Sequence, residues 1–241
     1  MLLIRLTFAL LFVSLSCFGQ EDSKTLFNDS DNLDSLLQHK DDITKLLITY
    51  GKGEFMPIEV YEFKNLDTLM LMYCRYEFMP VGISKLSKLK YLNIYATTLK
   101  NLPWDIIKLR ELKGMFIENL SEFDNFHISP FWKHLQVEDV RFFNKKISGW
   151  QNLSKNNYIK KLRLHEASSN FNFIHYLATM TELQMVEVSY SGSKGNIPKS
   201  KIESMKSLVF FVVISVTEEG ESYEYRTRPI ILPIQSFYNL L

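Results

Sequence analysis

Apolar residues recur along the central part of the chain with a fixed period. In a block that begins at Ile43, positions 0, 3 and 5 are apolar, and the same three positions are apolar in blocks that begin at Leu66 and Leu89. The block starts are 23 residues apart, because 66 − 43 and 89 − 66 both equal 23. Alternating apolar positions are typical of a short strand with one buried face. A repeat of this length predicts a solenoid of stacked structural units.

The second half of each block repeats in the same register. Positions 13 and 14 carry an apolar residue followed by proline, and positions 17 and 20 are apolar in all three copies. The residues are Met56-Pro57, Met79-Pro80 and Leu102-Pro103, then Val60, Ile83 and Ile106, then Phe63, Leu86 and Leu109. Proline does not continue a strand ladder, so this half predicts a loop or short helical turn that returns the chain to the next strand.

The segment 89–111, LKYLNIYATTLKNLPWDIIKLRE, resembles the leucine-rich-repeat form LxxLxLxxNxLxxLPxxIxxLxx found in bacterial secreted proteins. Weaker copies begin at Leu112, Leu135, Ile159 and Leu183, and a further apolar segment begins at Leu208. The resemblance implies an α/β leucine-rich-repeat solenoid, with a curved parallel sheet on the concave side and loops and short helical turns on the convex side. We therefore assign residues 43–207 to about seven repeats.

One position departs from the family pattern. The family carries asparagine at position 8, where the side chain satisfies backbone groups in the turn after the strand. In this chain the same position reads Gly51, Cys74, Thr97, Leu120, Phe143, Ala167 and Ser191. Cys74 and Thr97 are ordinary substitutes, so we expect Cys74 to be a structural residue of the turn rather than a nucleophile.

Each end of an open sheet needs a cover, because exposed strand edges invite aggregation. Residues 20–42 are acidic and amphipathic, with Leu33, Leu36 and Leu37 on one helical face, and we interpret them as an N-terminal cap. Residues 208–241 are interpreted as a C-terminal capping strand, a β-hairpin and a tail, because apolar residues 209–216 precede a polar turn and a second strand-like segment.

The N-terminus has the outline of a secretory signal peptide over residues 1–19. Arg5 precedes an apolar run from Leu6 to Leu15, and the small residues Cys17 and Gly19 precede a predicted cleavage before Gln20. The apolar run is shorter than the ~20 residues of a transmembrane helix, and no later segment is long enough to span a membrane. We therefore predict a secreted or cell-envelope protein, in the periplasm or on the outer surface, with lipid attachment at Cys17 as an alternative.

Charge and motifs argue against several functions. Loss of Arg5 with residues 1–19 leaves 27 basic and 27 acidic residues, so no net charge favours nucleic acid. The cluster Lys145, Lys146, Lys155, Lys160, Lys161 and Arg163 is interpreted as a solvated face. The five histidines lack the HExxH spacing of a zinc site, and nucleotide-loop and serine-hydrolase motifs are missing from the sequence. We expect no cofactor, no metal and no catalytic activity.

Positions 4 and 6 of each repeat should face the concave side. Position 4 reads Leu47, Met70, Asn93, Phe116, Asp139, Arg163 and Glu187, and position 6 reads Thr49, Met72, Tyr95, Glu118, Arg141, His165 and Ser189. Repeats two to four therefore present an apolar and aromatic patch, and repeats five to seven a charged one. The charged residues can be interpreted as ion pairs between neighbouring strands, which would stabilise the sheet. Large apolar residues have no such structural role on an exposed face, so for them we favour binding.

These patterns favour a non-enzymatic binding module that recognises a protein or peptide through its concave face. The residues assigned to binding are Met70, Met72, Tyr73, Tyr91, Tyr95, Phe116, Arg141, Arg163 and His165. The alternative function is a structural or adhesive component of the cell envelope, for which the sheet face is incidental.

Overall fold

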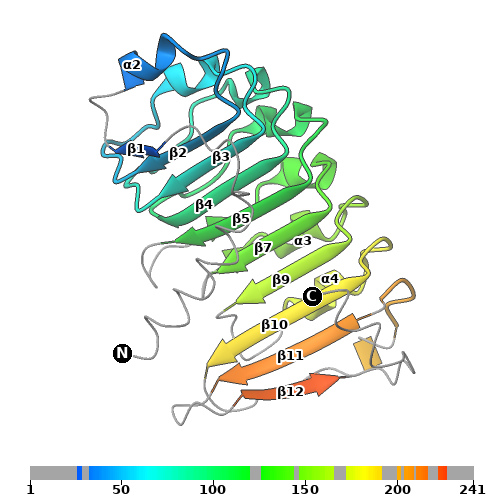
Figure 1. Cartoon of the computed structure of the whole chain (residues 1–241). Coiled ribbons are helices and arrows are strands. Elements are labelled where there is room, and N and C mark those ends of the chain that lie inside the picture. The colour runs from blue at the N-terminus through cyan, green and yellow to red at the C-terminus, as the bar shows by residue number, and fades with distance from the viewer. Residues whose placement is uncertain are drawn as a thin grey trace, which may run out of the picture.

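A computed structural model describes residues 26–28, 33–119, 126–143, 147–165, 172–191, 200–201, 204–208, 210–216 and 222–226. Its main feature is a ten-stranded sheet in the order β1-β2-β3-β4-β5-β7-β9-β10-β11-β12 (Figure 1). Every neighbouring pair from β1 to β11 is parallel, and only β11 and β12 pair antiparallel. The leucine-rich-repeat solenoid and the C-terminal β-hairpin predicted from the sequence are therefore confirmed.

The main sheet contains strands of three to seven residues. They are β1 (Leu26–Asn28), β2 (Lys45–Thr49), β3 (Thr68–Met72), β4 (Tyr91–Thr97), β5 (Gly114–Asn119), β7 (Asp139–Phe143), β9 (Lys161–His165), β10 (Met185–Ser191), β11 (Phe210–Val216) and β12 (Ser222–Arg226). Short helices lie in the segments that lead the chain from one strand to the next, called the returns below. They are α2 (Leu33–Leu37), η2 (Ile58–Glu62), η3 (Ile83–Lys85), η4 (Trp104–Lys108), η5 (Pro130–His134), α3 (Trp150–Leu153) and α4 (Ile174–Leu177). A separate two-stranded pair joins β6 (Phe126–His127) to β8 (Ile147–Ser148).

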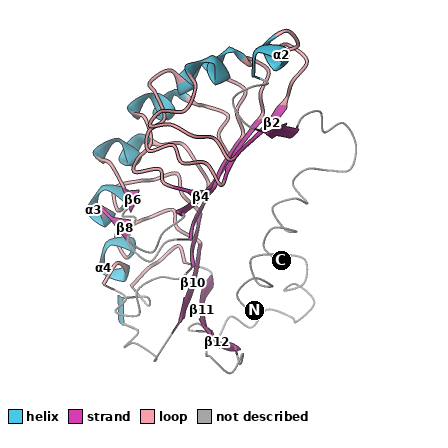
Figure 2. Ribbon diagram, turned by 90° about the vertical axis from the view of Figure 1, so that its left-hand side faces the viewer, coloured by secondary structure: helices cyan, strands magenta, loops and turns pink. Residues whose placement is uncertain are grey.

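The repeat positions explain the packing. Positions 3 and 5 of successive strands lie side by side, as Leu69 does with Leu92 and Leu71 with Ile94, and all four side chains are buried. Each repeat supplies one layer of this core, so the apolar side of one strand is covered only when its neighbours stack on it. Seen along its edge, the sheet is bowed, and the short helices lie on its convex side (Figure 2).

The N-terminal end differs in one respect from the expectation. α2 forms where Leu33, Leu36 and Leu37 predicted a helical face, with Leu33 buried. In addition, β1 pairs in parallel with β2 and extends the sheet by one strand. The sequence analysis did not predict this strand. Residues 1–19, with Cys17, and the tail 229–241 lie outside the described residues.

The predicted start of the fifth repeat at Leu135 is wrong. Leu135 ends the η5 turn, and its N–H bonds to Trp132 as the N–H of Leu109 bonds to Ile106 one repeat earlier. Leu135 therefore takes the place of Leu109 at position 20. The fifth repeat starts two residues later, at Val137, which is also buried.

The physical reason for this shift is the charge on Glu138. The predicted register would turn Glu138 into the core, whereas the observed one buries Val140 and Phe142 and leaves the Glu138 side chain 63% exposed. Burial of an unpaired carboxylate is far costlier than a change in repeat length. The corrected position 4 is Arg141, paired in register with Phe116 and Arg163, and the corrected position 6 is Phe143.

The core changes composition in the later repeats. Phe126, Trp132, Phe142, Trp150 and Phe173 form a chain of ring contacts with centroids 5.3–6.3 Å apart. Trp132 and Phe142 are fully buried at positions where earlier repeats carry isoleucine, leucine or valine. Aromatic rings of this size replace several smaller side chains, so the returns here are less regular than in the first three repeats.

A buried asparagine holds the return of this aromatic part. The Asn156 side-chain N–H groups donate to the carbonyls of Trp132 and Leu135 at 2.7 and 2.8 Å. Its side-chain oxygen accepts from the N–H groups of Tyr158 and Ile159 at 2.7 and 2.9 Å. All of the hydrogen-bonding capacity of the side chain is used, so it adds a bridge between η5 and the approach to β9 to the ordinary turn, in which the N–H of Asn156 bonds to the carbonyl of Leu153.

Candidate concave-face binding site

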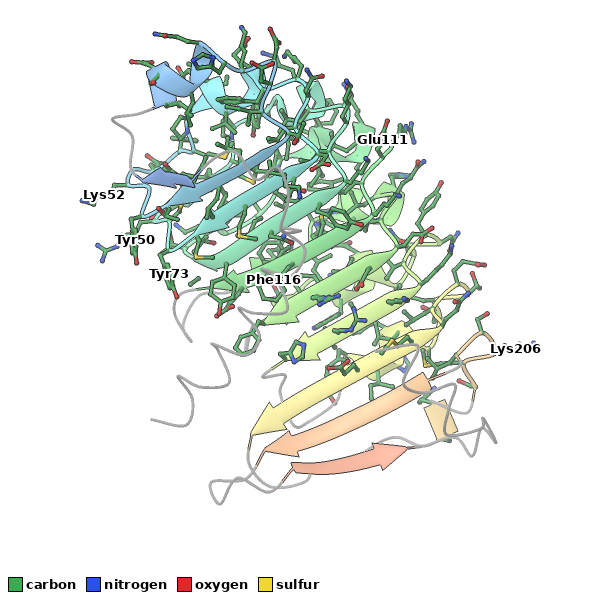
Figure 3. All side chains as sticks on the ribbon, viewed as in Figure 1. Tyr50, Lys52, Tyr73, Glu111, Phe116 and Lys206 are labelled. Carbon is green, nitrogen blue, oxygen red and sulfur yellow. The ribbon has the colours of Figure 1, made fainter. Side chains whose placement is uncertain are left out.

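The outward-facing side chains of the strands form two regions on the concave face. An aromatic row consists of Tyr50, Tyr73, Tyr95 and Phe116, contributed by four successive repeats. Its ring centroids are separated by 5.5, 6.1 and 5.7 Å. In Figure 3, Tyr50 and Tyr73 lie at the carboxyl ends of β2 and β3, and Phe116 lies further along the sheet. The row therefore follows the solenoid axis, as a binding surface for an extended ligand would.

Two members of the row have an unusual backbone. Tyr50 and Tyr73 both have φ of 55°, and Ala96 occupies the equivalent position of the next repeat with φ of 48°. This left-handed conformation costs an L-residue about 1–2 kcal/mol, and glycine or asparagine adopts it most readily. Stacking of the two rings, with an interplanar angle of 14°, offsets part of that cost. Tyrosine is thus unfavourable for the left-handed backbone of this turn.

Exposure separates the row into accessible and buried members. Tyr50 is 57% exposed and Tyr73 is 37% exposed, whereas Tyr95 is only 6% exposed. Burial raises the pKa of Tyr95, and the carboxylate of Glu118 raises it further. The pKa of Tyr73 is raised in the same direction, first by burial and then by Tyr50 and Glu118. Both phenols therefore stay protonated at neutral pH and can donate hydrogen bonds.

Three other residues assigned to the patch have different surroundings. Met70 is 2% exposed, so it supports the row and presents no free surface, and the expectation of an exposed Met70 is corrected. The same correction applies to Tyr95. Met72 is half-buried at the end of β3. Tyr91 is 40% exposed at the opposite end of its strand, beside Gly114, and does not join the row.

The charged region pairs internally. Arg163 donates to both carboxylate oxygens of Asp139 at 2.7 and 2.8 Å, and its Nε lies 3.5 Å from Glu187. Arg141 lies 3.4 Å from the same Asp139 carboxylate, with its side chain 38% exposed. Two cations and two carboxylates therefore balance, as the structural interpretation of these charges predicted.

His165 lies at the edge of this charged region. Its ring stacks on Phe143 with centroids 5.6 Å apart, and its Nε2 lies 3.9 Å from Glu187. Burial lowers the pKa of His165, and Arg141 and Arg163 add to this, while Glu187 acts in the opposite direction. The neutral form is thus favoured, and His165 offers an uncharged polar edge to the concave face.

Cys74 has the structural place expected of it. It is fully buried, and its thiol donates to the carbonyl of Ile48 at 3.4 Å, which links two repeats. Burial raises the Cys74 pKa to about 11, so little reactive thiolate forms at neutral pH. In the first repeat the same position is Gly51, where a Cβ atom would meet the Tyr76 hydroxyl at 2.1 Å. A tyrosine from the next repeat thus fills the space that asparagine takes in the family pattern.

Sequence reasoning missed Tyr50. The signal was present, because Tyr50 and Tyr73 both stand at position 7 of their repeats, 23 residues apart. Tyr73 was assigned to the binding surface, but the equivalent residue of the preceding repeat was not. Within the described residues, no group of three or more His, Cys, Asp or Glu side chains could hold a metal ion. No helix in these same ranges has the length and apolar character that a membrane crossing requires.

Solved structures of leucine-rich-repeat proteins superpose on this chain. An internalin C2 from Listeria monocytogenes superposes with a TM-score of 0.54 over 80% of this chain and 77% of its own, at 13% identity. The leucine-rich-repeat domain of the type III effector XopL superposes with a TM-score of 0.50 over 72% of this chain and 62% of its own, also at 13% identity. This chain has the leucine-rich-repeat fold.

The similarity does not extend to sequence. No protein-family model matches the leucine-rich-repeat chain, and no curated protein matches it. At 13% identity the solved structures share its backbone arrangement, and their ligands carry no information about its concave side chains. The concave side chains themselves therefore carry the information about function.

Proposed function

We propose that this protein is a non-enzymatic, exported interaction module that binds a protein or peptide through the concave aromatic row. The observation that carries the proposal is the pair Tyr50 and Tyr73, exposed tyrosines in left-handed backbone where glycine or asparagine fits better. Residues that oppose local backbone preference at the surface are commonly kept for a functional reason.

The chemistry of the row suits a polypeptide ligand. Tyrosine rings bury large apolar area at low entropic cost and still offer a hydroxyl, which explains their enrichment in protein interfaces. The neighbouring charged region is internally neutral, with Arg141 its most exposed cation. It provides a polar continuation of the surface rather than a second anchor.

Export is part of the same proposal. It rests on the signal-peptide pattern of residues 1–19, which includes Arg5 and the apolar run that follows it. The protein would then meet its ligand in the cell envelope or outside the cell. Mass measurement of the N-terminus of the exported protein tests cleavage before Gln20. An added lipid mass on Cys17 would show instead that the protein is anchored to a membrane by lipid.

The binding test uses Tyr50→Asn with Tyr73→Asn. Asparagine removes both rings and tolerates the left-handed backbone, so we expect stability to change by less than ~1 kcal/mol. Proteins captured from envelope extracts and culture medium by the parent and by this variant are compared by mass spectrometry. A true ligand should bind the variant at least about tenfold more weakly.

A matched control is Tyr158→Ser with Tyr176→Ser. These tyrosines are 43% and 37% exposed and lie outside the aromatic row. The control should retain every specific partner of the parent. If the Tyr50 and Tyr73 variant captures the same proteins with the same affinity as the parent, the concave row is not the binding site and the structural envelope role takes its place.

A further inference from the structure

The returns on the convex side carry a second exposed apolar row that the fold does not require. Ile58, Val81 and Trp104 all stand at position 15 of successive repeats and are 52%, 55% and 50% exposed. We call them the convex row. The residues next to them that point inward, such as Val60, Ile83 and Ile106, already complete the core. Among the described residues, core packing therefore does not account for the exposed apolar area of the convex row.

Two members of the convex row, Val81 and Trp104, lie in a basic part of the chain. Residues 79–113 contain seven lysines and arginines and two acidic residues, a net charge of +5 in a chain whose total is +1, although one of the seven, Lys100, pairs with Glu77 outside this range. Of the two acids, Asp105 is buried and accepts hydrogen bonds from the N–H groups of Gly82 and Ser84 at 3.0 and 3.1 Å. It therefore contributes little negative charge to the surface contact.

A cation stands beside the tryptophan of the convex row. Lys108 places its ammonium 4.8 Å from the centre of the Trp104 ring. Lys85 holds the equivalent sequence position in the repeat of Val81, whereas in the repeat of Ile58 this position is Glu62, which pairs with Lys40. Lys85, Lys108 and Arg110 are exposed and make no ion pair with a carboxylate among the described residues. Exposed Glu59, next to Ile58, makes that end of the row the less basic one.

We propose that the convex row docks this protein on an anionic lipid bilayer. Apolar side chains that enter the boundary between headgroups and acyl chains, flanked by lysines that meet anionic headgroups, form the arrangement that interfacial binding needs. Tryptophan with a cation beside its ring is suited to that depth, because its ring is apolar and its N–H remains hydrogen-bonded. Ile58 and Trp104 belong to η2 and η4, and the short helices lie on the convex side of the sheet (Figure 2).

This arrangement leaves the concave row free. A protein held by its convex side would present Tyr50 and Tyr73 away from the membrane. The inference does not depend on the proposed ligand of the concave face, because the two rows share no residue. The Tyr50→Asn, Tyr73→Asn variant should bind vesicles as the parent does.

Vesicle binding tests the proposal. The exported protein is mixed with vesicles of phosphatidylcholine alone or with added phosphatidylglycerol, and bound protein is measured by co-sedimentation. Trp104 is the exposed tryptophan among three, since Trp132 is fully buried and Trp150 is half-buried. We expect binding to the anionic vesicles, a blue shift of tryptophan emission and quenching by brominated acyl chains. Added salt should weaken binding by screening.

Two variants separate the apolar and ionic contributions. Ile58→Ser with Val81→Ser keeps the Trp104 reporter and should lower the partition coefficient at least about fivefold. Lys85→Gln with Lys108→Gln should lower it roughly fivefold for each charge removed. Tyr158→Ser with Tyr176→Ser is the matched control and should bind as the parent does. All forms are compared with the same N-terminus, so any contribution of residues 1–19 cancels.

Several results would overturn the proposal. One is the lack of binding to either vesicle, and another is binding that both sets of row variants leave unchanged. Heparin provides a third arm: if it binds as tightly as anionic vesicles and the Ile58→Ser, Val81→Ser change has no effect on either, the site recognises a polyanion and not a bilayer. Because all substituted positions are exposed, thermal unfolding midpoints near that of the parent are expected for every variant.

Discussion

The first three repeats and the later ones solve the same packing problem in different ways. Between Ile43 and Leu109 the inward positions 0, 3, 5, 13, 17 and 20 are filled by leucine, isoleucine, valine, methionine or phenylalanine at a constant 23-residue interval, and the returns are near copies of one another. From the fourth repeat onward, Trp132, Phe142 and Trp150 fill the core and the interval changes. A regular core allows a regular turn, whereas large rings require turns built for each site.

The two regions also differ on the concave face. The first three repeats carry three of the four members of the aromatic row, with Tyr50 and Tyr73 in strained backbone, and the later repeats carry the balanced ion pairs around Arg163. The region with the more regular core thus carries the exposed tyrosines in strained backbone, and the region with the less regular core carries the paired charges. A rigid, repetitive scaffold is a suitable platform for side chains that are reserved for a ligand.

The largest expected difference between the regions concerns the aromatic core. Phe142→Ala removes a fully buried ring that contacts Phe126, Trp132 and Trp150. It should lower the free energy of unfolding by about 3–5 kcal/mol, measured by urea denaturation with tryptophan emission. Leu92→Ala is the equivalent truncation in the regular region and should cost about 2–5 kcal/mol, toward the lower end because less volume is lost. A cost below about 1 kcal/mol for Phe142→Ala would mean that the rings are not packed together.

Asn156→Ala tests the turn that goes with this core. The change leaves two carbonyls and two N–H groups without their side-chain partner, three of them in buried surroundings. We expect a loss of about 2–3 kcal/mol in the free energy of unfolding, because unpaired buried polar groups are costly. Asn65→Ala is the control from the regular region, since Asn65 bonds to Asp41 and Lys88 at the surface and should cost under about 0.5 kcal/mol. Equal losses for the two variants would contradict the assigned role of Asn156.

Sequence spacing predicted the strand register of the regular region correctly, and in the later region it also placed the repeats that start at Ile159 and Leu183 but failed at the fifth repeat. The matching positions from Ile43 to Leu109 predicted strand register and inward residues, because each position has one physical requirement that leucine or isoleucine meets. At Leu135 the same rule failed, since leucine suits both position 20 of one repeat and position 0 of the next. Glu138 was the available signal, because a carboxylate at an inward position indicates a wrong register.

The candidate site was less predictable than the fold. Position 7 enters the aromatic row only because the backbone of Tyr50 and Tyr73 turns left-handed, and no sequence motif marks that turn. Burial of Met70 and Tyr95 likewise depends on the packing of neighbouring concave side chains. Alternation along a strand tells which face a residue occupies and not how much of it remains exposed.

The smallest expected effect is a pH dependence confined to the charged region. The pKa of His165 is lowered in the folded protein, so the unfolded chain binds a proton at this residue more readily than the folded chain does. The contribution of neutral His165 to the free energy of unfolding is therefore fully present above the ordinary pKa of about 6.5 and is lost as the pH falls below it. The thermal midpoint should therefore fall from about pH 7.5 to about pH 5.5 less steeply in His165→Gln than in the parent. His175→Gln, at an exposed histidine on α4, is the control and should keep the parent's slope.

The aromatic row should be untouched by His165→Gln, so ligand capture at pH 7.5 or above should be the same for this variant and the parent. A parent-like pH slope in His165→Gln would show that other groups carry the acid sensitivity and that His165 is not held neutral by its surroundings.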